Sequence, residues 1–169
     1  MTLPDIMTSV LPDEADRLRE LATDAVVLEV GAWWGFSTVL IALVAKSVSS
    51  VEWGLGDEHA GHDESLGPLI TNLDRYGVRG KVIVHVGASA DVLPLLPVGY
   101  FDFAFIDAYH TAEAVRRDAE LVIPLVHVHG HIGFHDYGDE RFGVKEAVDA
   151  LEGVEWVGLT RTLAVVRKL

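Results

Sequence analysis

A pair of glycines follows a short apolar run near the start of the chain. The run 25–30 (AVVLEV) leads into the segment 31–37 (GAWWGFS), which contains Gly31 and Gly35. Glycines four positions apart let the backbone approach a ligand closely, and the helix that follows them has free N-terminal amides. The spacing matches neither G-x-x-x-x-G-K-[ST] nor G-x-G-x-x-G, and Glu29 would repel a phosphate. We expect a ligand with an ammonium or sulfonium group, or else a Glu29 that serves as a hydrogen-bonded acid at a strand end.

The elements that must position this turn alternate along the chain. We expect strands at 25–30, 48–55, 81–86, 100–106 and 130–134, helices at 37–47, 66–76, 90–96, 112–126 and 143–151, and a closing antiparallel hairpin at 154–159 and 163–167. This alternation predicts an α/β fold with a seven-stranded, mostly parallel sheet and helices on both faces. Residues 25–169 form the expected single domain, after a helical lead-in over residues 1–24. Ligands in such sheets bind beyond the carboxyl ends of the strands.

Composition excludes several classes of protein. Half of the 169 residues are hydrophobic, and 13 Lys and Arg against 26 Asp and Glu give a net charge of −13. Such an acidic chain is repelled by nucleic acid and by anionic membranes. The first 20 residues have no apolar signal core, and the most apolar stretch, 38–45, is too short to span a bilayer. The absence of cysteine suits a cytoplasmic protein and excludes thiolate metal sites.

The glycine turn also resembles a known motif. The segment GAWWGFSTV is similar to the first motif of class I S-adenosylmethionine-dependent methyltransferases, in the small metal-dependent O-methyltransferase branch with catechol-type and sugar-type members. Four later segments match in order: DEHAG at 57–61, GASAD at 87–91, FIDAYH at 105–110, and FHDY at 134–137 with Gly143 and Val144. The resemblance covers about residues 25–169, and it implies the Rossmann-like fold of that class.

The resemblance implies S-adenosylmethionine as the cofactor. The residues that it assigns to the cofactor are Glu29, Gly31, Trp33, Gly35, Ser37, Asp57, Ser89 and Asp107. Gly31 and Gly35 would line the amino-acid part, and Ser89 would approach the adenine. Asp57 would hold the ribose hydroxyls, because a carboxylate can accept two hydrogen bonds. Glu52 and Glu58 compete for this role, since the predicted end of the second strand can shift by a few residues.

A divalent cation is implied between Asp107 and Asp136, which end two neighbouring strands. Two carboxylates repel each other unless a cation lies between them, and oxygen ligands without cysteine favour Mg²⁺ over Ca²⁺ or Mn²⁺. His135 stands where sugar-type relatives carry an acidic ligand. It could coordinate through nitrogen, which favours Mn²⁺ or Zn²⁺, or point elsewhere. The histidine-rich segment 127–131 is expected at the surface, at the other end of its strand.

His110 is the expected general base. It follows Asp107 by three residues, where catechol-type members have a lysine and sugar-type members a histidine. An ordinary pKa of about 6.5 suits a base at neutral pH. Tyr137 stands where the catechol type has an asparagine ligand, which argues against a catechol acceptor. The D-x-x-H segment at 107–110 and the D-x-H-x-G segment at 57–61 are closer to the sugar-type members, so the resemblance implies that the acceptor is a hydroxyl of a sugar, glycoside or related polyol, held on the metal. Asp107 and His110 would then be the catalytic residues.

Two other functions fit parts of this pattern. Asp107, His110, His135 and Asp136 could form an iron centre of two histidines and one carboxylate, as in oxygenases, but that leaves the glycine turn and Asp57 unexplained. A non-catalytic cofactor-binding scaffold would keep the turn, but it would not need Asp107, His110 and Asp136. The domain is small for the family and lacks the usual cover over the acceptor. We therefore expect a homodimer, in which a second subunit supplies that cover.

Overall fold

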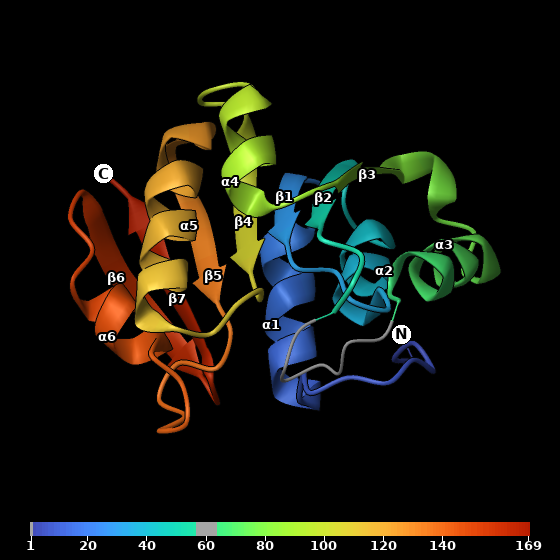
Figure 1. The fold of residues 1–169 in the computed structure, drawn as a ribbon, viewed down its shortest axis with the longest axis horizontal. Coiled ribbons are helices and arrows are strands. Elements are labelled where there is room, and N and C mark those ends of the chain that lie inside the picture. Colours follow the sequence, from blue (N-terminus) through green and yellow to red (C-terminus); the bar gives the residue numbers. More distant parts are fainter. Residues whose placement is uncertain (1, 57–63) are drawn as a thin grey trace.

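The computed structural model describes residues 2–56 and 64–169. Its centre is a seven-stranded sheet in the order β3-β2-β1-β4-β5-β7-β6 (Figure 1). The strands are β1 (Val26–Val30), β2 (Ser47–Glu52), β3 (Val82–Val86), β4 (Phe101–Ile106), β5 (Val126–Phe134), β6 (Val154–Thr160) and β7 (Leu163–Lys168). Strands β1 to β5 pair in parallel, and β7 is antiparallel to both β5 and β6. The predicted mostly parallel sheet with an antiparallel closing hairpin is confirmed.

Helices cover both faces of this sheet, as predicted. They are α1 (Pro12–Ala22), α2 (Phe36–Ala42), α3 (Leu66–Arg75), α4 (Ser89–Val92), α5 (Ala112–Leu125) and α6 (Val144–Asp149), with short 3₁₀ helices at Arg79–Lys81 and Leu93–Leu95. Successive strand residues face opposite sides, so Phe103 and Phe105 pack with α1, α2 and α3, whereas Ala104 and Ile106 pack with α5 and α6. Figure 1 shows α5 crossing in front of β5. None of the described helices is long and apolar enough to cross a membrane.

Helix α1 belongs to one of these two apolar layers. Its Ala15, Leu18 and Ala22 are fully buried in the same cluster as the side chains of α2. The leucine and the two alanines recur at spacings of three and four residues, which places them on one face of the helix. The division into a lead-in over residues 1–24 and a domain over 25–169 stays a prediction, but α1 is packed as tightly as the helices that follow it.

Two strand boundaries differ from the predicted ones by three residues or more. Strand β2 ends at Glu52, three residues early, because Gly54 has a φ of +94° and turns the chain. Strand β5 begins at Val126 instead of residue 130. Its register with β4 jumps from Phe101↔Val126 to Phe103↔His131, so the extra residues form a bulge. The histidines of this bulge hid the strand pattern in the sequence.

Candidate active site

The glycine turn lies against the residue that follows β4. Gly31 has a φ of +92°, and a Cβ there would lie 2.1 Å from the carbonyl oxygen of Asp107. The amide of Asp107 donates a hydrogen bond to the carbonyl of Val30 over 2.9 Å. Gly31 therefore lets the β1–α2 turn and the end of β4 meet backbone to backbone. Gly35, at a φ of +89°, is the N-cap of α2, and a Cβ there would lie 2.6 Å from Cδ1 of Leu69 on α3.

Glu29 is fully buried beneath this turn. Its carboxyl group accepts hydrogen bonds from the hydroxyls of Ser37 and Thr38 on α2, both at 2.6 Å, and of Ser50 on β2 at 2.7 Å. Burial raises the pKa of Glu29 to about 7, although the three hydroxyls oppose this shift. These contacts match the hydrogen-bonded strand-end acid that the sequence left open. A role of Glu29 or Ser37 at the cofactor stays a prediction.

Glu52 ends β2 beside the same turn. Its carboxylate accepts hydrogen bonds from the amides of Ala32 and Trp33, at 2.9 and 2.8 Å, and from the amide of Gly54 and the hydroxyl of Ser65, at 2.9 and 2.8 Å. It thus links the glycine turn to the segment after β2. Asp57 and Glu58, the other acidic candidates for the ribose, lie outside the described residues. The predicted role of Asp57 stays a prediction.

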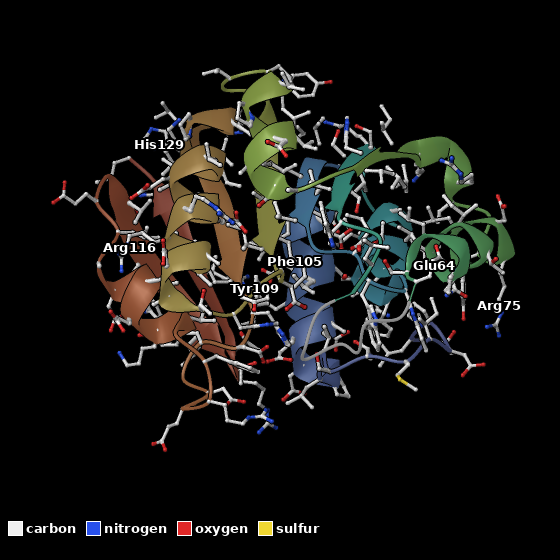
Figure 2. The ribbon with its side chains drawn as sticks, viewed as in Figure 1. Glu64, Arg75, Phe105, Tyr109, Arg116 and His129 are labelled. Carbon is white, nitrogen blue, oxygen red and sulfur yellow. The ribbon has the colours of Figure 1, made fainter. Side chains whose placement is uncertain are left out.

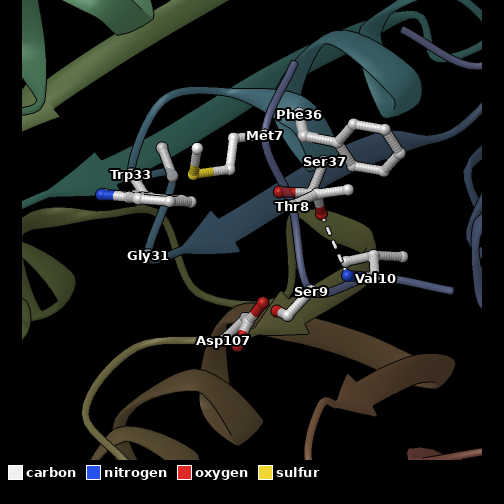
Figure 3. Close-up of a pocket in the computed structure, with 10 residues that line it drawn as sticks. Met7, Thr8, Ser9, Val10, Gly31, Trp33, Phe36, Ser37 and Asp107 are labelled. Atoms are coloured by element: carbon white, nitrogen blue, oxygen red, sulfur yellow. Dashed lines mark hydrogen bonds between the residues drawn. The ribbon is translucent and has the colours of Figure 1, made fainter. Parts of the chain in front are cut away.

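The segment before α1 forms a wall opposite the turn. A cavity of about 50 Å³ lies between them, and its lining residues are Met7, Thr8, Ser9, Val10, Gly31, Ala32, Trp33, Phe36, Ser37 and Asp107. Figure 3 shows Met7 beside Trp33, and Ser9 beside Asp107. Trp33 itself stacks on Trp34, with ring centroids 4.7 Å apart. This wall could not be predicted from the sequence, because residues such as Thr8 and Ser9 are compatible with any segment that leads into a helix.

Three donor groups meet at the carboxyl ends of β4 and β5. Asp107, His110 and Asp136 each offer a ligand atom, and these atoms lie within 4.8 Å of one another. Nε2 of His110 lies 3.5 Å from Oδ1 of Asp107 and 3.1 Å from Oδ2 of Asp136. Asp136 has a φ of +59°, a backbone conformation that is uncommon outside glycine and that clusters at functional sites. We call these three residues the acidic triad below.

The charges of the triad are strongly coupled. Burial lowers the pKa of His110, but the hydrogen bonds and charges of Asp107 and Asp136 outweigh it and raise that pKa to about 9. Burial alone would raise the pKa of Asp107 and Asp136, yet the nearby His135 and His110 hold both below the usual range. The His110 ring also stacks on Phe142, with centroids 4.5 Å apart. Without a bound ion, the site is therefore an ion-paired cluster at neutral pH.

His135 lies behind the triad and is almost completely buried. Its Nδ1 is 3.4 Å from Oδ1 of both Asp107 and Asp136, and its Nε2 is 3.3 Å from Oε2 of Glu14 on α1. Burial lowers the pKa of His135, but the surrounding carboxylates raise it to about 12. The group of three potential ligands contains His110 and not His135. A metal-ligand role of His135 stays a prediction, and Glu14 is a partner that sequence reasoning missed.

Ser89 and the histidine-rich segment complete the set of predicted positions. The Ser89 hydroxyl donates to Oδ1 of Asp118, a buried residue of α5, over 2.6 Å. Its approach to adenine stays a prediction. Nε2 of His127 lies 3.1 Å from Oδ1 of Asp102. His127 and His131 are half-buried and His129 is exposed, so only part of this segment lies at the surface as expected. Figure 2 shows His129 at the opposite end of the sheet from Tyr109, so the two groups of histidines are separate.

Comparison with known proteins agrees with this arrangement. A family model described as a methyltransferase domain matches residues 28–137, which is more than half of the chain. The chain belongs to this methyltransferase family. The matched range begins at β1 and includes the glycine turn and the acidic triad.

Two further comparisons concern individual relatives. A segment of 82 residues is 39% identical to catechol O-methyltransferase of Mycobacterium tuberculosis, covering 48% of this chain and 35% of that protein. The match thus spans about a third of the curated relative. The cofactor-bound structure of Rv0187 from MTB superposes with a TM-score of 0.76 at 25% identity, covering 98% of this chain and 83% of that one.

A more distant solved structure has the same fold. It is the O-methyltransferase TomG of Streptomyces achromogenes, involved in tomaymycin synthesis and solved in complex with SAM. Its TM-score is 0.72 at 19% identity, with 98% of this chain and 82% of that one covered. The helices and the sheet order described above are therefore those of a methyltransferase fold.

Proposed function

We propose that this chain is an S-adenosylmethionine-dependent O-methyltransferase. The acceptor would be a hydroxyl of a sugar, glycoside or related polyol. The observation that carries the proposal is the acidic triad at the ends of β4 and β5, directly beside the glycine turn at Gly31. The names of the relatives support methyl transfer to oxygen, and the replacement of an asparagine ligand by Tyr137 favours the sugar type.

The cofactor would lie along the carboxyl edge of β1, β2 and β4. Gly31 and Gly35 leave the backbone of the turn open to it, and Trp33 and Asp107 border the cavity there. Glu52 at the end of β2 already accepts four hydrogen bonds from this chain, so we propose that Asp57 binds the ribose hydroxyls and that Glu52 holds the turn beside it. The buried acids suit a cationic sulfonium better than a phosphate.

The donor set fits a hard divalent cation. Asp107 and Asp136 supply oxygens and His110 can supply an imidazole nitrogen, all within 4.8 Å, which suits Mg²⁺ or Mn²⁺. We propose that the two aspartates hold the ion. A bound cation would lower the pKa of the acceptor hydroxyl beside it.

His110 would remove the proton of the acceptor hydroxyl. Its Nε2 faces the two aspartates and its ring stacks on Phe142, so the base points into the site. The aspartates raise the pKa of His110 to about 9; a cation held between them would offset their charge and lower this pKa, so that a neutral imidazole would be present to accept the proton. A bound S-adenosylmethionine would supply the methyl group: its carbon–sulfur bond would break as the acceptor oxygen forms a bond to the methyl carbon, with the electron pair left on sulfur. The proton ends on Nε2 of His110. Since the charge of the sulfonium disappears, positioning by the turn and the triad would provide most of the acceleration.

Calorimetric titration with S-adenosylhomocysteine tests the cofactor, once with Mg²⁺ and once with chelator. We expect saturable one-site binding, followed by cation-dependent methylation in a screen of sugar and glycoside acceptors read by mass spectrometry. Absence of binding in both buffers would contradict a methyltransferase. In that case the iron oxygenase becomes the better reading, because His135 also borders both aspartates. Iron content and oxygen-dependent turnover would then decide.

The proposal extends to the assembly and its location. We propose a cytoplasmic homodimer, in which a partner subunit covers the acceptor site. Light scattering coupled to size exclusion measures the mass in solution, and a monomer that methylates its acceptor at full rate would contradict this part.

A further inference from the structure

Glu14 is a buried carboxylate that the proposed reaction does not use. It lies on the first turn of α1 and is fully buried. Its Oε2 accepts a hydrogen bond from the amide of Leu11 over 2.7 Å, which caps the helix. A capping role alone needs no burial, and capping acids of this kind are commonly exposed. The burial of Glu14 is therefore explained by its other contacts and not by its capping role.

Those contacts join α1 to two distant segments. Oε1 of Glu14 accepts hydrogen bonds from the amide and the hydroxyl of Thr162 in the β6–β7 turn, both at 2.7 Å. Oε2 lies 3.3 Å from Nε2 of His135, 121 residues away in the sequence. One carboxylate thus holds the helix start, the hairpin turn and the imidazole behind the triad.

The opposite edge of the His135 ring faces the two aspartates of the triad. With Nε2 directed at Glu14, its Nδ1 edge faces Oδ1 of Asp107 and Oδ1 of Asp136 at 3.4 Å each. A carboxylate behind an imidazole fixes the orientation of the ring, and such outer partners determine how well the inner groups are placed for an ion. Nδ1 lies within ion-pair distance of both aspartates without a hydrogen bond to either, so the orientation of the ring sets the charge that the two carboxylates face.

We infer that Glu14 is a positioning residue of the active site. Through His135 it holds Asp107 and Asp136 at the separation that a divalent cation needs. This inference rests on the proposed function, in that the two aspartates are taken to bind the cation. It adds a residue of α1 to a site otherwise built from the ends of β4 and β5.

The test measures Mn²⁺ affinity by electron paramagnetic resonance of the free ion, without substrate. Glu14→Gln keeps the size of the side chain but removes the charge that holds His135. We expect its Mn²⁺ dissociation constant to rise by about 10–100-fold. The matched control is Asp13→Asn, which removes the exposed ion pair between Asp13 and Arg161, at 2.9 Å. This pair joins the same helix to the same turn without touching His135, so we expect wild-type Mn²⁺ affinity.

A second pair of variants separates positioning from general loss of structure. Thr162→Val removes one hydroxyl from Glu14 but leaves His135 in place, so it can lower the melting temperature while Mn²⁺ affinity stays unchanged. His135→Asn should weaken Mn²⁺ binding as much as Glu14→Gln does, and the double variant should lose no more than either single one. The ring-nitrogen NMR signals of His135 should move in Glu14→Gln and stay in Asp13→Asn.

The outcomes distinguish failure of the proposed cation site from failure of the role inferred for Glu14. A wild-type chain that binds no Mn²⁺ overturns the cation site, and this inference with it. A wild-type chain that binds Mn²⁺ and a folded Glu14→Gln variant that binds it equally well overturn the inference alone. If Glu14→Gln does not fold, His135→Asn decides: unchanged Mn²⁺ affinity in that variant overturns the inference.

Discussion

The buried acids at the ends of β1 and β2 differ from the acids at the ends of β4 and β5. Glu29 and Glu52 are surrounded by hydroxyl and amide donors, so every oxygen has a neutral partner. Asp107 and Asp136 face each other and two histidines. Burial raises the pKa of Glu29 to about 7, whereas the neighbouring histidines hold the pKa of Asp107 and Asp136 below the usual range. Partner type therefore separates acids that hold the fold from acids that can bind a cation.

The largest expected effect concerns the base in the acidic triad. His110→Ala should lower methyl-transfer turnover by about 10²–10⁴-fold, while the affinity for S-adenosylhomocysteine stays close to wild type. His129→Ala, at the other end of the sheet, is the control and should leave turnover unchanged. Equal losses of turnover and cofactor affinity would contradict the base. A parallel loss of Mn²⁺ affinity would make His110 a ligand instead.

A substitution of Gly31 tests whether the β1–α2 turn and the end of β4 must be in contact. A Cβ at this position would lie 2.1 Å from the carbonyl oxygen of Asp107, at a φ that side chains rarely adopt. Gly31→Ala should lower the free energy of unfolding by about 4 kcal/mol and abolish cofactor binding. Gly77→Ala has a similar φ of +69° but meets no described atom within 4 Å, and it should cost about 1 kcal/mol. Urea unfolding measures both, and equal losses would contradict the close contact.

The pH dependence of stability tests the neutral acid. The pKa of Glu29 rises from 4.5 to about 7 on folding, so the folded chain keeps a proton that the unfolded chain releases. Its contribution to stability is therefore complete below about pH 4.5 and is lost as the pH rises to about 7, a change of about 3 kcal/mol. Glu29→Gln should remove this slope in urea unfolding between pH 5 and 8. If the free energy of unfolding has the same pH dependence in wild type and Glu29→Gln, a group other than Glu29 holds the proton.

A smaller expected effect is the pH dependence of Mn²⁺ binding at the acidic triad. Protonated His110 and a cation compete for the same two aspartates, and the pKa of His110 is about 9 without the ion. Mn²⁺ affinity should therefore rise by about tenfold per pH unit between pH 7 and 9. In His110→Ala the slope should flatten. A wild-type affinity that is independent of pH would show that no proton leaves when the ion binds.

Much of the fold could be predicted from the sequence, because hydrophobic periodicity and composition are local properties of a segment. The order of strands and helices and the position of Asp107 and Asp136 at strand ends follow from them. Partners that come from distant segments do not. Nothing near His135 indicates Glu14, 121 residues away, and the hydroxyl of Ser50 could not be assigned to Glu29. The end of β2 depended on one residue, Gly54, whose left-handed φ makes Glu52 the last residue of the strand.

The histidines show the same limit within one strand. The segment 127–131 carries a strand with a bulge, but its polar residues conceal the alternation. Directly after β5, His135 and Asp136 are adjacent in sequence yet differ in burial and in partners. The left-handed φ of Asp136 gives its side chain a different direction from that of His135. No local sequence pattern predicts such a backbone turn.

The contact between Gly31 and Asp107 has a mechanical consequence. The backbone that would border the methyl donor and the backbone that carries a cation ligand touch each other, without a side chain between them. If the proposed function holds, the methyl-donor and acceptor sites are parts of one rigid unit, and thermal motion displaces them together. The distance over which the methyl group would travel is then set by the sheet itself. Any closing movement would serve to exclude water or to admit the acceptor, not to bring the reacting groups into line.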